Sequence, residues 1–235
     1  MYTRLLLTKE KASPTDAYVG GGAFLPENIP WPACVEGRAL FHLMALPAHW
    51  FYPQGVAEDF WFSVFIPTDT WDHSHFRRLR AVKGTSDAVV LAYRRGGASR
   101  SRCMSDSLER GRIERVECLE PDDDENLDSK LDGVDAWLQS PLTWNGGRRR
   151  LMLYGADIDG ILPSHKGVLS DGMAYLFLRD KPDFSPGGRG RSFSNWAESV
   201  FCCVPRWLCT EVHIHARRGS TAPGSAGRWP ATPYR

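Results

Sequence analysis

The sequence lacks several features that would place it in a known functional class. No apolar run approaches the roughly 18–20 residues that cross a bilayer, and Leu5-Leu6-Leu7 is too short for the core of a signal peptide. We therefore expect a cytoplasmic protein that does not associate with a membrane. The formal net charge is only +1, so we expect no general electrostatic attraction to nucleic acid.

Cysteine usage gives no support for a metal site or a disulfide scaffold. The six cysteines include no Cys-x-x-Cys pair, the spacing that many structural zinc sites use. They are also sparse for a disulfide-rich domain in a chain of 235 residues. We interpret them as reduced thiols, and we expect no cofactor and no metal site.

Long helices and familiar catalytic motifs are absent as well. There is no Gly-x-Ser-x-Gly elbow, no phosphate loop and no dinucleotide-binding fingerprint. No sustained 3.6-residue period occurs, so we expect at most short helices near residues 47–52 and 122–130. Short aromatic and β-branched runs occur instead, and they indicate a β-rich, mainly antiparallel single domain with minor α content. The predicted strands are 4–8, 38–46, 59–66, 88–93, 112–119 and 151–156.

A stretch rich in glycine and proline, residues 20–32, is the most distinctive local feature. The glycine triplet 20–22 gives the backbone freedom to turn sharply or to pass close to another segment. The prolines within 26–32 exclude a helix or a central strand. Trp31 therefore projects from a stiff ribbon, either as an anchor that packs the ribbon onto a sheet or as a ligand contact.

The second half of the chain repeats this pattern. Ala23-Phe24-Leu25 begins eight residues before Trp31, and Ala136-Trp137-Leu138 begins eight residues before Trp144. A hydrophobic segment follows each Trp, so we predict an internal duplication in which Trp31 and Trp144 are equivalent. The hydrophobic segments are 40–45 and 151–156, and the predicted half-repeats are about 18–120 and 129–186.

Three short motifs occur in an order and spacing that resemble one family. They are 21–26 with Trp31-Pro32, then 129–133 leading into 136–139, and finally 171–178. Over roughly residues 18–186 the chain resembles the YwqG-like family, a group of mostly bacterial proteins of uncharacterised function. The resemblance implies a β-rich domain with an internal repeat, and it implies no catalytic residue.

The chain departs from the family pattern at three places. The strand of the first copy has Ala45 where the family usually has Gln. The second copy has Asp132-Gly133 where the family has two glycines. Family members also tend to end on a strand like Gly-x-Phe-Phe-x-Gln. Codons compatible with 191–196 can yield Val-Phe-Phe-Gln-Leu in a neighbouring reading frame, which would restore such a strand. We hypothesise a frameshift near 187–191 that makes 189–235 a disordered or non-native tail, and the coding DNA tests this hypothesis.

Three aspartates are the best candidates for a ligand-binding or catalytic site, in addition to Trp31 and Trp144. They are Asp157, Asp159 and Asp171. Hard cations such as Ca²⁺ bind carboxylate oxygens, and paired acids serve hydrolases as acid and base. Aspartates in such positions also form turns and caps, and the twelve-residue calcium loop is absent. Both readings stay open.

Other charged motifs carry weaker signals. His73-Ser74-His75 has metal-ligand spacing, but the neighbouring arginines disfavour a cation, so a polar loop is preferred. Arg148-Arg149-Arg150 could contact phosphate but lacks the aromatic platform of a nucleic-acid site. The acidic run 121–125 indicates a solvated linker, and the Arg-, Ser- and Gly-rich segment 94–111 indicates a loop.

The sequence leaves two functional hypotheses open. The first is a binding or interaction module for an unknown protein or small-molecule partner. It is favoured by the nine tryptophans and by the absence of a complete catalytic set. The second is a small hydrolase or metal-dependent enzyme that uses Asp157, Asp159 and Asp171. We favour the first, and we expect neither nucleic acid nor a membrane as partner.

Overall fold

The computed structural model describes residues 1–34, 36–68, 79, 87–101, 108–138, 141, 147–169 and 172–180, and the backbone of 200–204. The strands are β1 (Tyr2–Thr8), β2 (Ala17–Val19), β3 (Phe41–Pro47), β4 (Phe60–Ile66), β5 (Val89–Arg94), β6 (Gly111–Cys118), β7 (Lys130–Leu131), β8 (Arg148–Tyr154), β9 (Met173–Leu178) and β10 (Val200–Val204). The described helices are α2 (Gly155–Ile161) and the short 3₁₀ turns η1 (Ala48–Trp50) and η3 (Pro163–His165).

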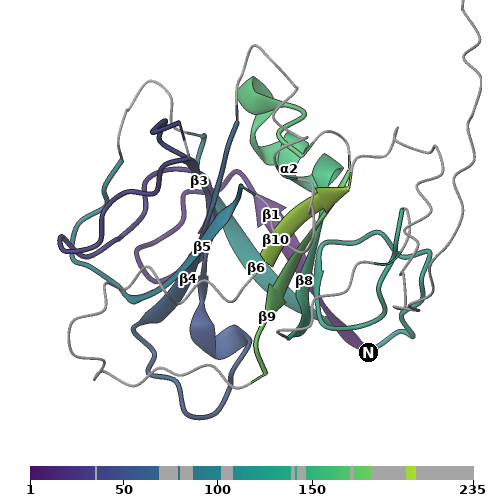
Figure 1. Ribbon diagram of the computed structural model, residues 1–235. Helices are drawn as coiled ribbons and strands as arrows, with labels where there is room; N and C mark the ends of the chain where they lie inside the picture. Colours follow the sequence, from purple (N-terminus) through teal and green to yellow (C-terminus); the bar gives the residue numbers. More distant parts are fainter. Residues whose placement is uncertain are drawn as a thin grey trace, which may run out of the picture.

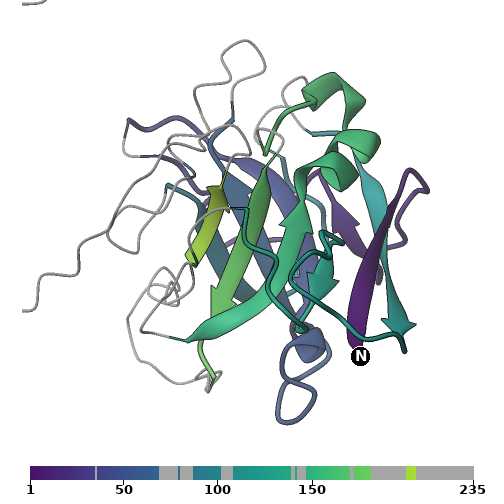
Figure 2. The same cartoon turned by 90° about the vertical axis from the view of Figure 1, so that its right-hand side faces the viewer.

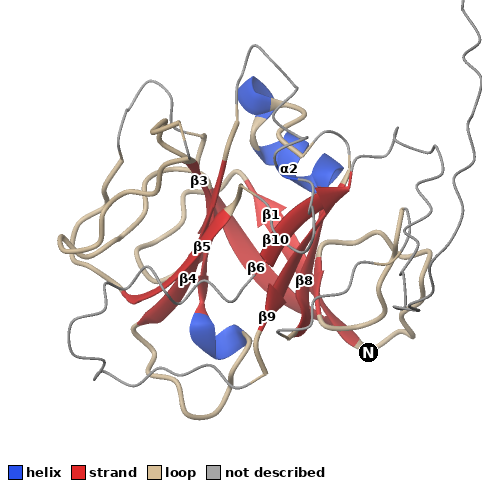
Figure 3. Cartoon of the chain, in the orientation of Figure 1, coloured by secondary structure: helices blue, strands red, loops and turns tan. Residues whose placement is uncertain are grey.

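These strands form one ten-stranded antiparallel sheet in the order β10-β9-β8-β7-β1-β6-β2-β3-β4-β5 (Figure 1, Figure 3). The sheet curls, and its two outermost strands, β5 and β10, contact each other (Figure 2). We call β2 to β5 the first half of the sheet and β7 to β10 the second half. The prediction of a β-rich, antiparallel fold with minor α content is confirmed.

Apolar side chains gather in three places around this sheet. The concave face encloses an inner core to which both halves and α2 contribute. A first outer cluster lies on the convex face of the first half, beneath the ribbon 20–34, and a smaller second outer cluster lies on the second half. Both faces of β4 are therefore covered, which explains why its sequence is apolar at every position except Ser63 rather than alternating.

The strand order is symmetric about the β1–β6 pair at the centre of the sheet. Each half follows its short strand with two residues of positive φ, Gly20-Gly21 in the first half and Asp132-Gly133 in the second. Each half also has a bulge, after His42 in one and after Arg149 in the other. A duplicated chain would give this arrangement, and the duplication itself stays a prediction.

The positions of the bulges align the two halves with a different offset from the one that the sequence pattern predicts. Matching His42 with Arg149 gives an offset of 107 residues, against 111 between Leu40 and Leu151. The hydrophobic segments alone could not fix this register, because apolar residues on both faces leave no alternation to align.

Several local predictions were wrong. Residues 122–129 form an irregular loop with a turn at 124–125 rather than a helix, and Lys130 begins β7. The helix α2 occupies 155–161, where a strand end was expected. The acidic run 121–125 is not a free linker, because the Asp122 side chain is only 3% exposed and is bound to Lys130. A buried lysine on β7 needs a carboxylate nearby, and this loop supplies it.

The proposed tail is described only at Val200–Val204, where the chain forms β10 and pairs with β9. At these five residues the structure differs from the expectation of disorder. The remainder of 189–235 lies outside the described residues, and the frameshift stays a hypothesis. Among the described residues, no helix has the length and apolar character to cross a membrane.

Candidate functional site

Asp157 and Asp159 make separate structural contacts. Asp157 Oδ2 accepts hydrogen bonds from the hydroxyl of Ser129 (2.7 Å) and from its backbone N–H (3.3 Å). Asp159 Oδ1 accepts a bond from the backbone N–H of Gly167 (2.8 Å). Both lie on α2, and two residues correspond to about 200° of helical rotation, so the carboxylates diverge. They fix α2 to its neighbours, as turn-forming and capping aspartates do.

The structure does not assemble the predicted aspartate site within the part of the chain that it describes. Asp171 lies outside that part, as do Trp144 and the histidines 73 and 75. Within it, no three His, Cys, Asp or Glu residues are grouped so that they could hold a metal ion.

Trp31 anchors the ribbon to the first half of the sheet. Its indole N–H donates to the carbonyl oxygen of Leu40 (2.8 Å), and its ring meets Phe65 edge-on at 5.1 Å. The ring belongs to the partly buried rim of the first outer cluster. These contacts fit the anchor reading of Trp31.

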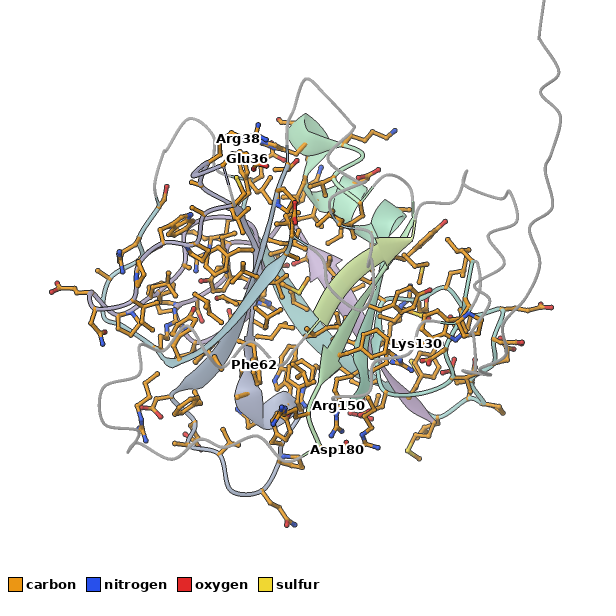
Figure 4. The ribbon with its side chains drawn as sticks, in the orientation of Figure 1. Glu36, Arg38, Phe62, Lys130, Arg150 and Asp180 are labelled. Atoms are coloured by element: carbon orange, nitrogen blue, oxygen red, sulfur yellow. The ribbon has the colours of Figure 1, made fainter. Side chains whose placement is uncertain are left out.

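The arginines of the 148–150 triplet are each paired with an acid. Arg149 bonds the carboxylate of Asp135 and the carbonyl oxygens of Asp132 (2.7 Å) and Gly133 (2.9 Å). Arg148 and Arg150 both contact Asp180, at 3.0 and 3.1 Å, and Figure 4 shows Arg150 beside Asp180. The triplet is therefore not a free phosphate site.

Lys130 on β7 is another cation that the second half neutralises. Its ammonium is fully buried and donates to both Asp122 oxygens, at 2.8 and 3.0 Å, and to the Asn126 carbonyl at 3.1 Å. Burial opposes ionisation of Asp122, but the bonds from Lys130, Val134 and Asn126 outweigh it and lower the pKa of this carboxyl. The second half thus gives these buried cations acidic partners.

The glycine triplet lets residues 108–110 lie directly against the ribbon. A Cβ at Gly20 would stand 1.6 Å from the carbonyl oxygen of Glu109, which no side chain tolerates. Gly21 donates its backbone N–H to Leu108 (2.8 Å), and its Cα lies close under the Arg110 side chain. Because the triplet has no side chains, Arg110 reaches the first outer cluster.

Two arginines and three aromatic rings meet at this place. We name Tyr18, Phe24, Trp61, Arg95 and Arg110 the arginine–aromatic site. The Arg95 guanidinium carbon lies 3.7 Å from the centre of the Phe24 ring and 4.6 Å from that of Trp61. The Arg110 guanidinium carbon lies 4.2 Å from the Tyr18 centre and 5.5 Å from the Phe24 centre. Both cations thus share the Phe24 ring.

Neither of these arginines has an acidic partner among the described residues. Four of their nitrogens are buried without a hydrogen-bond acceptor, Nη1 and Nη2 of Arg95 and Nε and Nη2 of Arg110. Burial lowers the pKa of Arg95, and the positive charge of Arg110 adds to this lowering. Two acids lie nearby, Asp59, whose backbone carbonyl accepts from the Arg95 N–H, and Glu109, which precedes Arg110; both carboxylates bond other groups, although Oε2 of Glu109 is buried without a partner. Asp59 bonds Arg94 at 2.8 Å, and Glu109 bonds Ser164 at 2.8 Å.

The buried polar group beneath the site is neutral. His42 Nδ1 lies 3.2 Å from the Gly20 carbonyl oxygen, which only accepts, so Nδ1 carries the proton and Nε2 accepts from Ser63 (3.1 Å). The Ser63 hydroxyl also bonds that of Tyr93 at 2.7 Å. Burial lowers the pKa of His42 to about 4. Within the described residues, this network of His42, Ser63 and Tyr93 offers the arginines no anion.

The two halves differ at matching positions. Tyr18 and Lys130 occupy corresponding places on β2 and β7, and His42 and Arg149 precede the corresponding bulges. In the second half the cations at these positions bond Asp122 and Asp135. The first half has neutral side chains there, and Arg95 and Arg110 beside them have no acidic partner among the described residues.

No protein-family model and no curated protein matches the chain.

The arginine–aromatic site is a feature that the sequence did not reveal. Its two arginines lie at the two ends of the segment 94–111, which looks like an ordinary loop in the sequence. The glycine triplet was a real signal for the close approach of another segment, but it could not identify 108–110 as that segment.

Proposed function

We propose that this protein is a binding module without a catalytic role, and that it binds an anionic group at the arginine–aromatic site. The observation that carries the proposal is the pair of guanidiniums on one phenylalanine ring, with four buried nitrogens that lack acceptors. A cytoplasmic location and membership of the YwqG-like family belong to the same proposal and rest on the sequence.

The energies favour an anion at this place. A buried donor without an acceptor costs about 1–3 kcal/mol, and a cation–π contact returns only about 0.5–2 kcal/mol. A hydrogen bond to a charged group contributes about 1.5–3 kcal/mol. An anion between Arg95 and Arg110 would supply such bonds and would relieve the repulsion between the two cations.

The hydrolase alternative has less support. Asp157 and Asp159 are used in structural bonds, and the third acid of that hypothesis, Asp171, lies outside the described residues. No contact among the described residues points to an acid and a base that share a substrate.

Thermal unfolding in the presence of anions tests the binding proposal. Sodium phosphate and sodium chloride are compared at equal ionic strength, in wild type and in Arg95→Gln and Arg110→Gln. At one hundred times the dissociation constant, phosphate should raise the wild-type melting temperature by roughly 5–10 °C beyond the chloride effect.

Both arginine variants should lose this specific increment and keep the general salt effect that phosphate exerts on all proteins. Arg94→Gln is the matched control, because Arg94 is next in the chain, exposed, and already paired with Asp59. Equal phosphate increments in wild type and both site variants would refute the proposal.

A further inference from the structure

The chemistry of the two guanidiniums narrows the class of anion that the arginine–aromatic site accepts. Aromatic rings lie against both guanidinium groups, so hydrogen bonds leave from their edges. Two nitrogens of each guanidinium lack a hydrogen-bond partner, so a ligand that satisfies both groups must offer several acceptor lone pairs. A carboxylate has two oxygens to offer, whereas a phosphate monoester has three terminal oxygens.

The charge of the site points to the same class. Arg95 and Arg110 bring two positive charges, and the neighbouring carboxylates of Asp59 and Glu109 bond Arg94 and Ser164. A carboxylate or a sulfate ester neutralises one of these charges. A phosphate monoester carries about −1.5 to −2 at pH 7 and neutralises both.

The site is also held in place from several directions before any ligand arrives. Backbone bonds join the ribbon to residues 96–100, from Gly96 N–H to Phe24 (2.7 Å) and in both directions between Ala23 and Arg100 (2.8 and 2.9 Å). The bond from Gly21 to Leu108 fixes the segment that carries Arg110. The backbone segments that carry Phe24 and the two arginines are thus fixed, so binding has to order only the arginine side chains.

We propose that the arginine–aromatic site binds the phosphate monoester group of a small molecule, with Arg95 and Arg110 as the two ligands of its oxygens. This inference rests on the proposed function and names its ligand class. Because the four guanidinium nitrogens without acceptors are buried in the structure, binding would require both arginine side chains to turn outward about their flexible stems.

Calorimetric titration with three phenyl compounds separates charge from shape. Phenyl phosphate has the dianionic group, phenyl sulfate has the same three oxygens with a single charge, and benzoate has two oxygens with a single charge. At pH 7.5 phenyl phosphate should bind at least tenfold more tightly than the other two. Its affinity should fall several-fold at pH 5, where the phosphate loses its second charge, while phenyl sulfate should be unaffected.

Arg95→Gln and Arg110→Gln should each weaken phenyl phosphate binding at least tenfold, and Arg94→Gln should leave it unchanged. Arg110→Lys keeps the positive charge but loses the planar guanidinium that can donate two parallel hydrogen bonds. Its affinity for phenyl phosphate should therefore lie between those of wild type and Arg110→Gln. Inorganic phosphate in place of phenyl phosphate shows whether the ester carries part of the affinity.

The outcomes distinguish the two proposals. Equal or tighter binding of phenyl sulfate or benzoate, lost in both arginine variants, would overturn the phosphate assignment and leave anion binding intact. No binding of any of the three anions would overturn both. Equal losses in Arg94→Gln and the site variants would show a general electrostatic effect, and would also overturn both.

Discussion

His42 is a fully buried imidazole in which both ring nitrogens have hydrogen-bond partners. Its bonds to the Gly20 and Gly21 carbonyls hold the turn that follows β2, and its bond to Ser63 ties that turn to β4. The neutral form is required, because Nε2 must accept the Ser63 hydroxyl. Protonation would place an unpaired charge in the first outer cluster.

This requirement predicts an acid-sensitive stability. Burial lowers the pKa of His42 to about 4, below the usual value of 6.5, so the unfolded chain binds the extra proton first as the pH falls. The stabilisation is fully present above pH 6.5 and decreases as the pH falls towards 4, by about 3 kcal/mol in total. Urea unfolding at pH 7 and pH 4.5 measures it.

His42→Gln is the control, because glutamine can bond the same groups and does not titrate. The variant should be less stable than wild type at pH 7, and the difference should shrink at pH 4.5. Asp122 does not interfere, since its pKa is lowered and its effect lies below this range. Parallel pH profiles for the two proteins would contradict the role given to His42.

At the scale of elements, the ribbon 20–34 is held where residues 108–110 pass beneath its glycines. Gly20 has φ +68° and no room for a Cβ, whereas Gly37 has φ +78° and nothing within 4 Å. Both glycines have a left-handed backbone, but only Gly20 has another segment, 108–110, packed directly against it. Alanine at each therefore separates backbone strain from collision.

Gly37→Ala should lower the free energy of unfolding by about 1–2 kcal/mol, the strain of a left-handed alanine. Gly20→Ala should lower it by roughly 1–3 kcal/mol more, because the ribbon and segment 108–110 must separate. Chemical denaturation measures both, and phosphate binding should weaken only in Gly20→Ala. Equal losses in stability would show that the close approach contributes nothing.

The helices and strands also show how much of the fold could be predicted from the sequence. Strands such as β4 were predictable, because seven consecutive aromatic, β-branched or small residues end at a proline. β2 and β7 were missed, since three and two residues are too few to show a period. The helix α2 was missed because its aspartates, Asp157 and Asp159, suggested a site, while in the structure they bind backbone and hydroxyl groups of neighbouring segments.

The site depended on contacts that no local pattern encodes. Arg95 and Arg110 are fifteen positions apart and meet only because Phe24, far away in the chain, lies between them. Lys130 and Asp122 illustrate the same point, since the acidic run 121–125 is exposed except at Asp122, which the buried ammonium of Lys130 binds. Trp31 was predicted more fully, because prolines on both sides already limited its role.

At the scale of the whole molecule, the charges are nearly balanced, with 29 lysines and arginines against 28 acids. A phosphate ion therefore meets no general attraction, and any selective binding must come from a local departure from this balance. The second half of the sheet neutralises its buried cations with Asp122 and Asp135, whereas Arg95 and Arg110, beside the first half, have no such partners among the described residues.

The most direct test of anion binding follows the arginine side chains themselves. In ¹⁵N-labelled protein, the Nε–Hε signals of Arg95 and Arg110 are assigned from the spectra of Arg95→Lys and Arg110→Lys, and inorganic phosphate is then added. The signals of these two arginines should move and saturate together, while that of Arg94, bonded to Asp59, should stay in place. Unmoved signals for Arg95 and Arg110, or equal shifts across many arginines, would contradict a selective anion site between them.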